Sequence, residues 1–140
     1  MEIVNGKDVD EGLKDSGRVY LCGNLKMSNG VRHVQTDGYE IGISKYSEFT
    51  FEKAHIHTFN QEYNYIIEGE AKVFLLNEEK EYYLSAGDLY VIKVNEPYVG
   101  KYTAGTKIIF SKDPGGNDKQ LVEMNDRLMK WGESWEATYN

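Results

Sequence analysis

Two histidines and a glutamate, spaced so that they can close on one metal ion, are the most informative residues of the chain. His55 and His57 are separated by one residue, so in an extended strand both side chains leave the same face, about 6.6 Å apart. Glu62 follows after four intervening residues, enough for the chain to turn and enter a second strand. Its carboxylate can then point back toward the histidines. Two imidazoles and one carboxylate leave the other metal positions open, so the spacing predicts an open metal site with His55, His57 and Glu62 as ligands.

The order His-x-His, Glu62 and then Gly69 resembles the first motif of the cupin superfamily. Proteins of this superfamily fold as a double-sheeted jelly roll. The resemblance therefore implies an all-β fold, a double-stranded β-helix, with a metal bound inside the barrel. Imidazole ligands favour a divalent transition metal (Zn, Mn, Fe or Ni) over Ca. Phe49 stands where the motif has its leading glycine.

The second cupin motif is only partly matched. Gly87 and Asp88 fit its start, but Tyr98 stands where the family has a fourth ligand, a histidine. Tyr102 stands where the family has an asparagine, and it shares the strand parity of Tyr98, so both tyrosines should face the cavity if either does. A neutral phenol is a poor metal ligand near neutral pH. We therefore predict that Tyr98 faces the metal as a hydrogen-bond donor or general acid, without ligating it.

Lys53 is the second candidate for a catalytic role. If His55 and His57 face inward, strict alternation sends Lys53 to the same face, together with Phe49 and Phe51. There Lys53 could pair with an anionic substrate or act as an acid or base. The alternative interpretation is that Lys53 lies near the strand edge and extends its ammonium group to water.

Length and charge predict one compact domain over residues 1–140. The net charge is −7, with 16 basic and 23 acidic residues, so a phosphate backbone or an anionic membrane would meet a repelling surface. We expect neither nucleic acid nor membrane as a partner. The first residues lack the basic and then apolar run of a signal peptide, and no apolar stretch approaches ~18 residues. This favours a cytoplasmic protein.

Short strands separated by turn residues dominate the chain, which is typical of a sandwich or barrel. Apolar residues then recur at steps of three and four from Leu121 to Trp135. This stripe predicts an amphipathic C-terminal α-helix at about 118–131, with the core barrel at about 31–111. Exposed sheet edges and this helix offer surface for a second copy, so we expect a homodimer. The predicted strands are 18–22, 31–35, 39–44, 48–56, 63–68, 71–76, 80–84, 88–93, 98–102 and 106–111, with a break at 28–30 among others.

Three classes of function fit these observations. In the first, a metal-binding cupin acts on a small polar molecule by isomerase, lyase or dioxygenase chemistry, as the family resemblance implies. In the second, a metal-free isomerase or epimerase acts on a sugar nucleotide, with a histidine as base and Tyr98 as acid, which the missing fourth ligand favours. In the third, the barrel binds a small carboxylate or sugar without catalysis. The intact His-x-His and Glu spacing makes the first our leading hypothesis.

Overall fold

Two β-sheets build the molecule in the computed structural model, which describes residues 1–26 and 31–140. The predicted break at 28–30 lies outside these ranges. The first sheet has the strand order β2-β1-β3-β11-β6-β9 and the second the order β12-β5-β10-β7-β8, with β4 paired to β10. The first contains β1 (Arg18–Gly23), β2 (Val34–Gln35), β3 (Glu40–Lys45), β6 (Gln61–Glu68), β9 (Leu89–Ile92) and β11 (Lys107–Asp113). The second contains β4 (Thr50–Phe51), β5 (His55–His57), β7 (Glu70–Leu75), β8 (Lys80–Ser85), β10 (Tyr98–Tyr102) and β12 (Lys119–Leu121).

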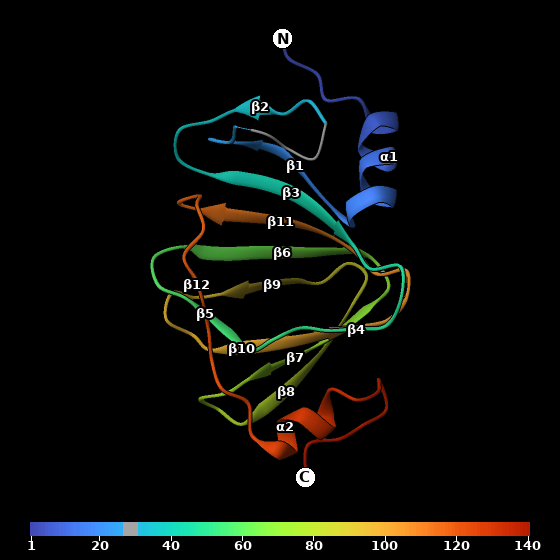
Figure 1. The fold of residues 1–140 in the computed structure, drawn as a ribbon, viewed down its shortest axis with the longest axis vertical. Helices are drawn as coiled ribbons and strands as arrows, with labels where there is room; N and C mark the ends of the chain where they lie inside the picture. Colours follow the sequence, from blue (N-terminus) through green and yellow to red (C-terminus); the bar gives the residue numbers. More distant parts are fainter. Residues whose placement is uncertain (27–30) are drawn as a thin grey trace.

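The helices lie at opposite ends of the long axis, α1 (Gly6–Ser16) beside β1 and α2 (Asp126–Trp131) next to β8 (Figure 1). The sequence analysis did not predict α1. Its start is capped by Asn5, whose side chain accepts a hydrogen bond from the Lys7 N–H at 2.9 Å, and it ends at Gly17, whose φ of 72° suits glycine. Val9 and Leu13 pack on Val19 of β1. The helix therefore closes one end of the first sheet.

The C-terminal helix is shorter than predicted. It begins at Asp126, because the preceding segment Lys119–Leu121 pairs with β5 as the strand β12. Trp131 is fully buried in a cluster with Phe74 and Leu128. This cluster also receives Phe51, whose ring lies 6.0 Å from that of Trp131.

Lys101 of β10 holds the end of the chain in place. Its ammonium group donates hydrogen bonds to the carbonyl oxygens of Trp131 at 2.7 Å, Ser134 at 2.9 Å and Ala137 at 2.9 Å. It also lies 4.3 Å from the centre of the Trp131 ring. A lysine that is completely buried is tolerated here because each of its hydrogens has an acceptor.

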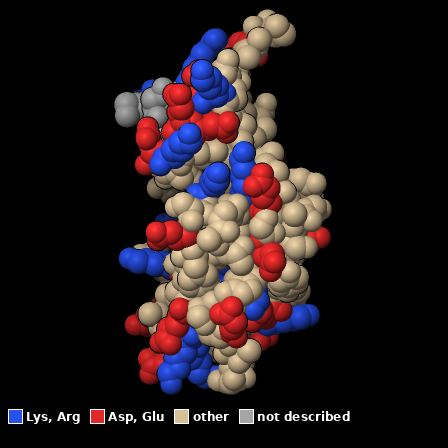
Figure 2. Space-filling view, turned by 90° about the vertical axis from the view of Figure 1, so that its right-hand side faces the viewer, with Lys and Arg blue, Asp and Glu red and all other residues tan. Residues whose placement is uncertain are grey.

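Neither helix is long and apolar enough to cross a membrane, within the ranges that the structure describes. On the face shown in Figure 2, acidic and basic side chains are interspersed and gather toward the two ends of the molecule. The middle of this face is covered mostly by other residues. No large area of one sign stands out on it.

Candidate functional site

A cavity of about 530 Å³ is lined by residues from both sheets. The predicted ligands His55, His57 and Glu62 all lie in its wall, and so do Tyr98 and Tyr102. Only 4% of His55 and 3% of His57 are exposed. The structure therefore brings together the residues of both motifs. These include Tyr98, at the position of the fourth ligand, and Tyr102, four residues later.

The His55 imidazole is held between a main-chain carbonyl and a phenol. His55 of β5 lies opposite Tyr98 of β10 in the sheet register, and the Tyr98 hydroxyl is 2.9 Å from His55 Nε2. His55 Nδ1 lies 2.9 Å from the Lys53 carbonyl oxygen. Because a carbonyl only accepts, Nδ1 carries the hydrogen and Nε2 accepts one from Tyr98. Burial lowers the pKa of His55 to about 4 and raises that of Tyr98 well above its usual range, so both groups are neutral near pH 7.

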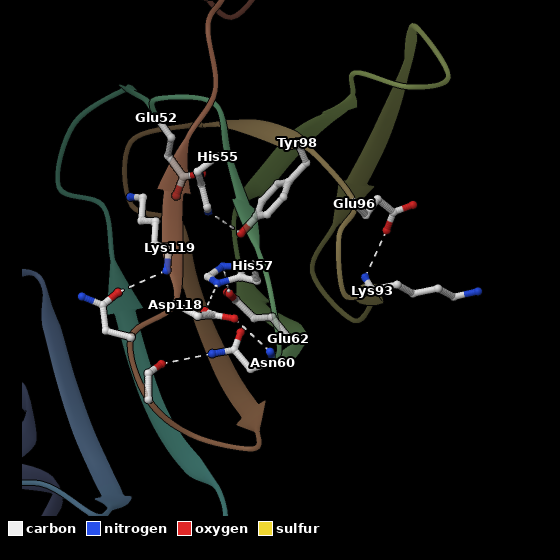
Figure 3. Close-up of polar contacts among 12 residues, drawn as sticks. Glu52, His55, His57, Asn60, Glu62, Lys93, Glu96, Tyr98, Asp118 and Lys119 are labelled. Carbon is white, nitrogen blue, oxygen red and sulfur yellow. Dashed lines mark hydrogen bonds and ion pairs between the residues drawn. The ribbon is translucent and has the colours of Figure 1, made fainter.

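The His57 imidazole lies between two carboxylates, as Figure 3 shows. Its Nδ1 is 2.7 Å from Asp118 Oδ1, and its Nε2 is 3.1 Å from Glu62 Oε2. Burial would lower the pKa of His57, but the two carboxylates outweigh it and raise the pKa. Although Glu62 is close, His57 Nε2 has no hydrogen bond of acceptable geometry within the described residues.

Asp118 is a site residue that the sequence analysis missed. Its Oδ2 accepts hydrogen bonds from the N–H groups of Phe59 at 2.8 Å and Asn60 at 2.9 Å, so it fixes the turn after β5 as well as His57. Burial would raise the pKa of Asp118, but these donors and His57 lower it to about 2. In the sequence, Asp118 stands at the predicted start of the C-terminal helix at about 118–131. Its contact with His57 spans 61 residues, and no local signal predicts it.

A row of charged side chains crosses the inner face of the first sheet. Lys112 of β11 lies between Glu40 of β3 and Glu62 of β6 in the register. Burial would raise the pKa of Glu62, but His57 and Lys112 lower it. Glu40 Oε1 accepts a hydrogen bond from the Gly116 N–H at 2.8 Å, which anchors the loop that carries Asp118. The row therefore keeps Glu62 ionised and positions that loop.

The alternation predicted across residues 48–56 is interrupted. The chain forms two short strands, and in the gap between them the Glu52 N–H donates to the Gly100 carbonyl at 3.0 Å. As a result Glu52, rather than Phe51, lines the cavity with His55. Lys53 is exposed and is not part of the cavity wall. The structure brings its carbonyl oxygen to the site, but not its side chain.

The imidazole nitrogens and the carboxylate oxygens of the cavity wall are donor types that a divalent transition metal binds. Both Nδ1 atoms are engaged by acceptors, so Nε2 is the nitrogen of each ring that could bind a metal. That of His57 lies 3.1 Å from Glu62 Oε2, and that of His55 accepts a hydrogen bond from Tyr98. The buried His57 Nε2 without a hydrogen bond is the position that a metal would satisfy. In the described part of the chain, however, no group of three or more His, Cys, Asp or Glu residues is already arranged to hold an ion. Instead, the Tyr98 hydroxyl donates a hydrogen bond to His55 Nε2.

Known protein structures share this fold. A chain from the structures of the DMSP lyases RdDddP and RnDddQII has a TM-score of 0.59 and 16% identity over 76% of this chain and 52% of its own length. An RmlC-like cupin from Shewanella frigidimarina has a TM-score of 0.51 and 18% identity over 58% and 70%. Pac13 from Streptomyces, a nucleoside dehydratase, has a TM-score of 0.56 and 14% identity over 66% and 76%.

These similarities confirm the predicted fold, a cupin-like, all-β jelly roll with a C-terminal helix. The structure adds the N-terminal helix α1 to it. The chain spans about half the length of the first of these structures. No protein-family model and no curated protein matches the sequence.

Replacing Asp118 with asparagine should weaken the binding of Zn²⁺ or Ni²⁺ by about 10- to 100-fold, because an amide holds the His57 Nδ1–H less firmly than a carboxylate does. Calorimetric titration of the metal-free protein measures this change. Asp113→Asn is the matched control, since Asp113 is exposed in the same segment. Equal affinities of Asp118→Asn and the unmodified protein would show that Asp118 does not orient a ligand.

Proposed function

We propose that this protein is a metal-binding enzyme that acts on a small polar molecule inside the barrel, with His55, His57 and Glu62 as the metal ligands. The observation that carries the proposal is that each imidazole binds an acceptor through Nδ1 while both rings and Glu62 line one cavity. A metal would then bind His57 Nε2 and would displace the Tyr98 hydroxyl from His55 Nε2. Zn, Mn, Fe or Ni fits these donors. Such a metal, when bound, supplies Lewis acidity toward a carbonyl or hydroxyl oxygen.

Structural neighbours that are described as lyases and a dehydratase support a small-molecule substrate. Within this cavity, Tyr98 is the group placed to exchange a proton with the substrate. Its hydroxyl is neutral and already donates to His55, so it can turn the same hydrogen toward a bound oxygen atom. Asp118 keeps His57 oriented, and the buried position of both imidazoles limits competition from bulk water.

The purified protein should carry about one equivalent of a transition metal, and a His55→Ala, His57→Ala double variant should carry almost none, because imidazole supplies two of the three ligands. Elemental analysis measures both. His33→Ala is the control, since His33 itself does not line the cavity, although its ring contacts the carbonyl oxygen of Leu25 in the cavity wall. Metal content near zero after reconstitution of the unmodified protein would contradict the proposal.

A metal-free acid–base enzyme is the second candidate, as in an isomerase or epimerase acting on a sugar nucleotide. The hydrogen bond from Tyr98 to His55 Nε2 favours it, because it pairs a neutral acid with a neutral base at the atom that a metal would need. In this reading His55 accepts a proton from the substrate and Tyr98 returns one. A non-catalytic binding module, a homodimer and a cytoplasmic location stay predictions.

Tyr98→Phe separates the roles of this residue. We expect the variant to keep its metal but to bind or turn over its small-molecule ligand less well, because only the hydroxyl is lost from a ring that is packed in the wall. Metal content and ligand binding are measured on the same preparation. Loss of the metal would show that Tyr98 is a metal ligand. A variant with unchanged metal content and unchanged ligand binding would show that Tyr98 only packs in the cavity wall.

A further inference from the structure

Glu52 presents a buried carboxylate oxygen to the cavity that nothing in the proposed mechanism uses. Its Oε1 accepts a hydrogen bond from the Tyr46 hydroxyl at 3.3 Å. Its Oε2 is buried and has no hydrogen-bond partner of acceptable geometry in the described ranges. A buried polar atom without a partner destabilises the folded protein. Such a group in a cavity wall points to a partner that enters from outside the chain.

The surroundings of Glu52 indicate which kind of partner fits. Tyr46, Tyr90 and Tyr102 lie in the same wall, and burial raises the pKa of each, with further repulsion from Glu52. These neutral phenols can each donate and accept a hydrogen bond. The rings of Tyr46 and Tyr102 are stacked, with centres 4.2 Å apart and planes within 2°. The wall is therefore a fixed set of hydroxyl groups around one carboxyl group.

A hydroxyl group complements this wall better than other ligand groups do. It can donate to the Glu52 carboxylate or accept from a protonated Glu52, so it satisfies the free oxygen in either state. An apolar group would leave Oε2 unpaired, and an anionic group placed at Oε2 would meet the negative charge of an ionised Glu52. Arg18, Lys112 and Lys119 also line the cavity, so this repulsion is local to Glu52. The cavity volume of about 530 Å³ lies in the range of small-molecule sites. It has room for a ligand that reaches both Glu52 and the Tyr98–His55 pair.

We propose that Glu52 and Tyr46 form a subsite that binds a hydroxyl group of the substrate, and that the substrate is a polyhydroxylated small molecule of the sugar or polyol class. This inference rests on the proposed function, because it assumes that a small polar molecule occupies the cavity. It assigns to Glu52 a role in substrate selection that is separate from metal binding.

Two matched pairs of compounds test the proposal: myo-inositol against cyclohexanol, and methyl β-D-ribofuranoside against its 2,3-dideoxy analogue. Binding is followed by NMR of the tyrosine ring signals in protein stripped of metal by a chelator. We expect the hydroxylated member of at least one pair to bind and to shift the Tyr46 and Tyr102 signals. Its partner should bind on the order of tenfold more weakly or not at all.

Glu52→Met should weaken the binding of the hydroxylated compound about tenfold, because methionine has a similar length but offers no strong acceptor. Glu52→Gln should retain most of the binding, since an amide can also donate and accept. Glu68→Met is the control, because Glu68 is exposed and outside the cavity wall. Far-ultraviolet circular dichroism confirms that each variant is folded.

The proposal is overturned if no hydroxylated compound binds, if the deoxygenated compounds bind equally well, or if Glu52→Met binds like the unmodified protein. Equal binding by the deoxygenated compounds would mean that Glu52 is satisfied by water alone. Because binding is measured without metal, this outcome is independent of the metal content that tests the proposed function. A protein that never retains metal could still select hydroxyl groups, and a metal-loaded protein could fail to do so.

Discussion

Replacing Lys101 with methionine is expected to lower the free energy of unfolding by about 3 to 5 kcal/mol, the typical cost of breaking a buried charged network. The reason is that the buried Lys101 ammonium group donates to three carbonyl oxygens, those of Trp131, Ser134 and Ala137. Methionine fills a similar volume, so the decrease in the free energy of unfolding measures the lost hydrogen bonds rather than the cost of a cavity. Urea unfolding measures the change.

Lys72 provides a graded comparison for this experiment. It lies opposite Lys101 in the register of β7 and β10, but it donates to only one carbonyl, that of Trp135 at 2.8 Å, and its ion pair with Glu81 is partly exposed. Lys72→Met should therefore cost about 1 kcal/mol. If both variants lose the same free energy, the three acceptors of Lys101 contribute no more than one acceptor does.

Replacing Glu52 with glutamine is expected to change how the stability of the metal-free protein depends on pH. Burial, followed by repulsion from Glu62, raises the pKa of Glu52 from 4.5 to about 7. The folded state therefore binds more protons than the unfolded state between these values. This contribution to stability is fully present below pH 4.5 and is lost as the pH rises through 7.

Glutamine does not titrate, so the variant should gain stability relative to the unmodified protein as the pH rises through this window. The relative gain is on the order of 3 kcal/mol. Urea unfolding at about pH 4 and about pH 8 brackets the window. Glu68→Gln is the exposed control. A constant difference between Glu52→Gln and the unmodified protein across these pH values would contradict the raised pKa.

The fold and the centre of the site could be predicted because both depend on short-range patterns. Strand rhythm and turn residues located most of the strands, and the spacing of His55, His57 and Glu62 fixed their common direction. Strand parity correctly placed Tyr98 and Tyr102 on the cavity wall. The signals for α1 were also local: Asn5 and Gly17 cap a helix whose Val9 and Leu13 are four residues apart.

The rest of the site depends on contacts between distant segments. Glu52 reaches the cavity because β10 binds the chain on both sides of a gap in the predicted strand, at Phe51 and at His55. The predicted helix included residues 119–121 because its apolar stripe begins at Leu121, but these residues pair with β5 as the strand β12. Such tertiary pairing overrides local preference. Lys53 was placed on the inner face only because strict alternation was assumed through that gap.

The loop from Gly115 to Asp118 restricts which changes in chain length the protein can accept. One end is held at the start of β3, by the carbonyl of Gly38 just before this strand and by Glu40 within it. The other end is held at the turn after β5, through Asp118. A single inserted residue adds up to ~3.8 Å of chain. This is more than the 2.7 Å between Asp118 Oδ1 and His57 Nδ1, so an insertion could separate the two groups. By contrast, the exposed β7–β8 turn at Glu78 and Glu79 is held by hydrogen bonds from the hydroxyl groups of Tyr82 and Tyr139, neither of which lines the cavity. Insertions and deletions among natural homologues should therefore accumulate at that turn, while the Gly115–Asp118 spacing keeps its length.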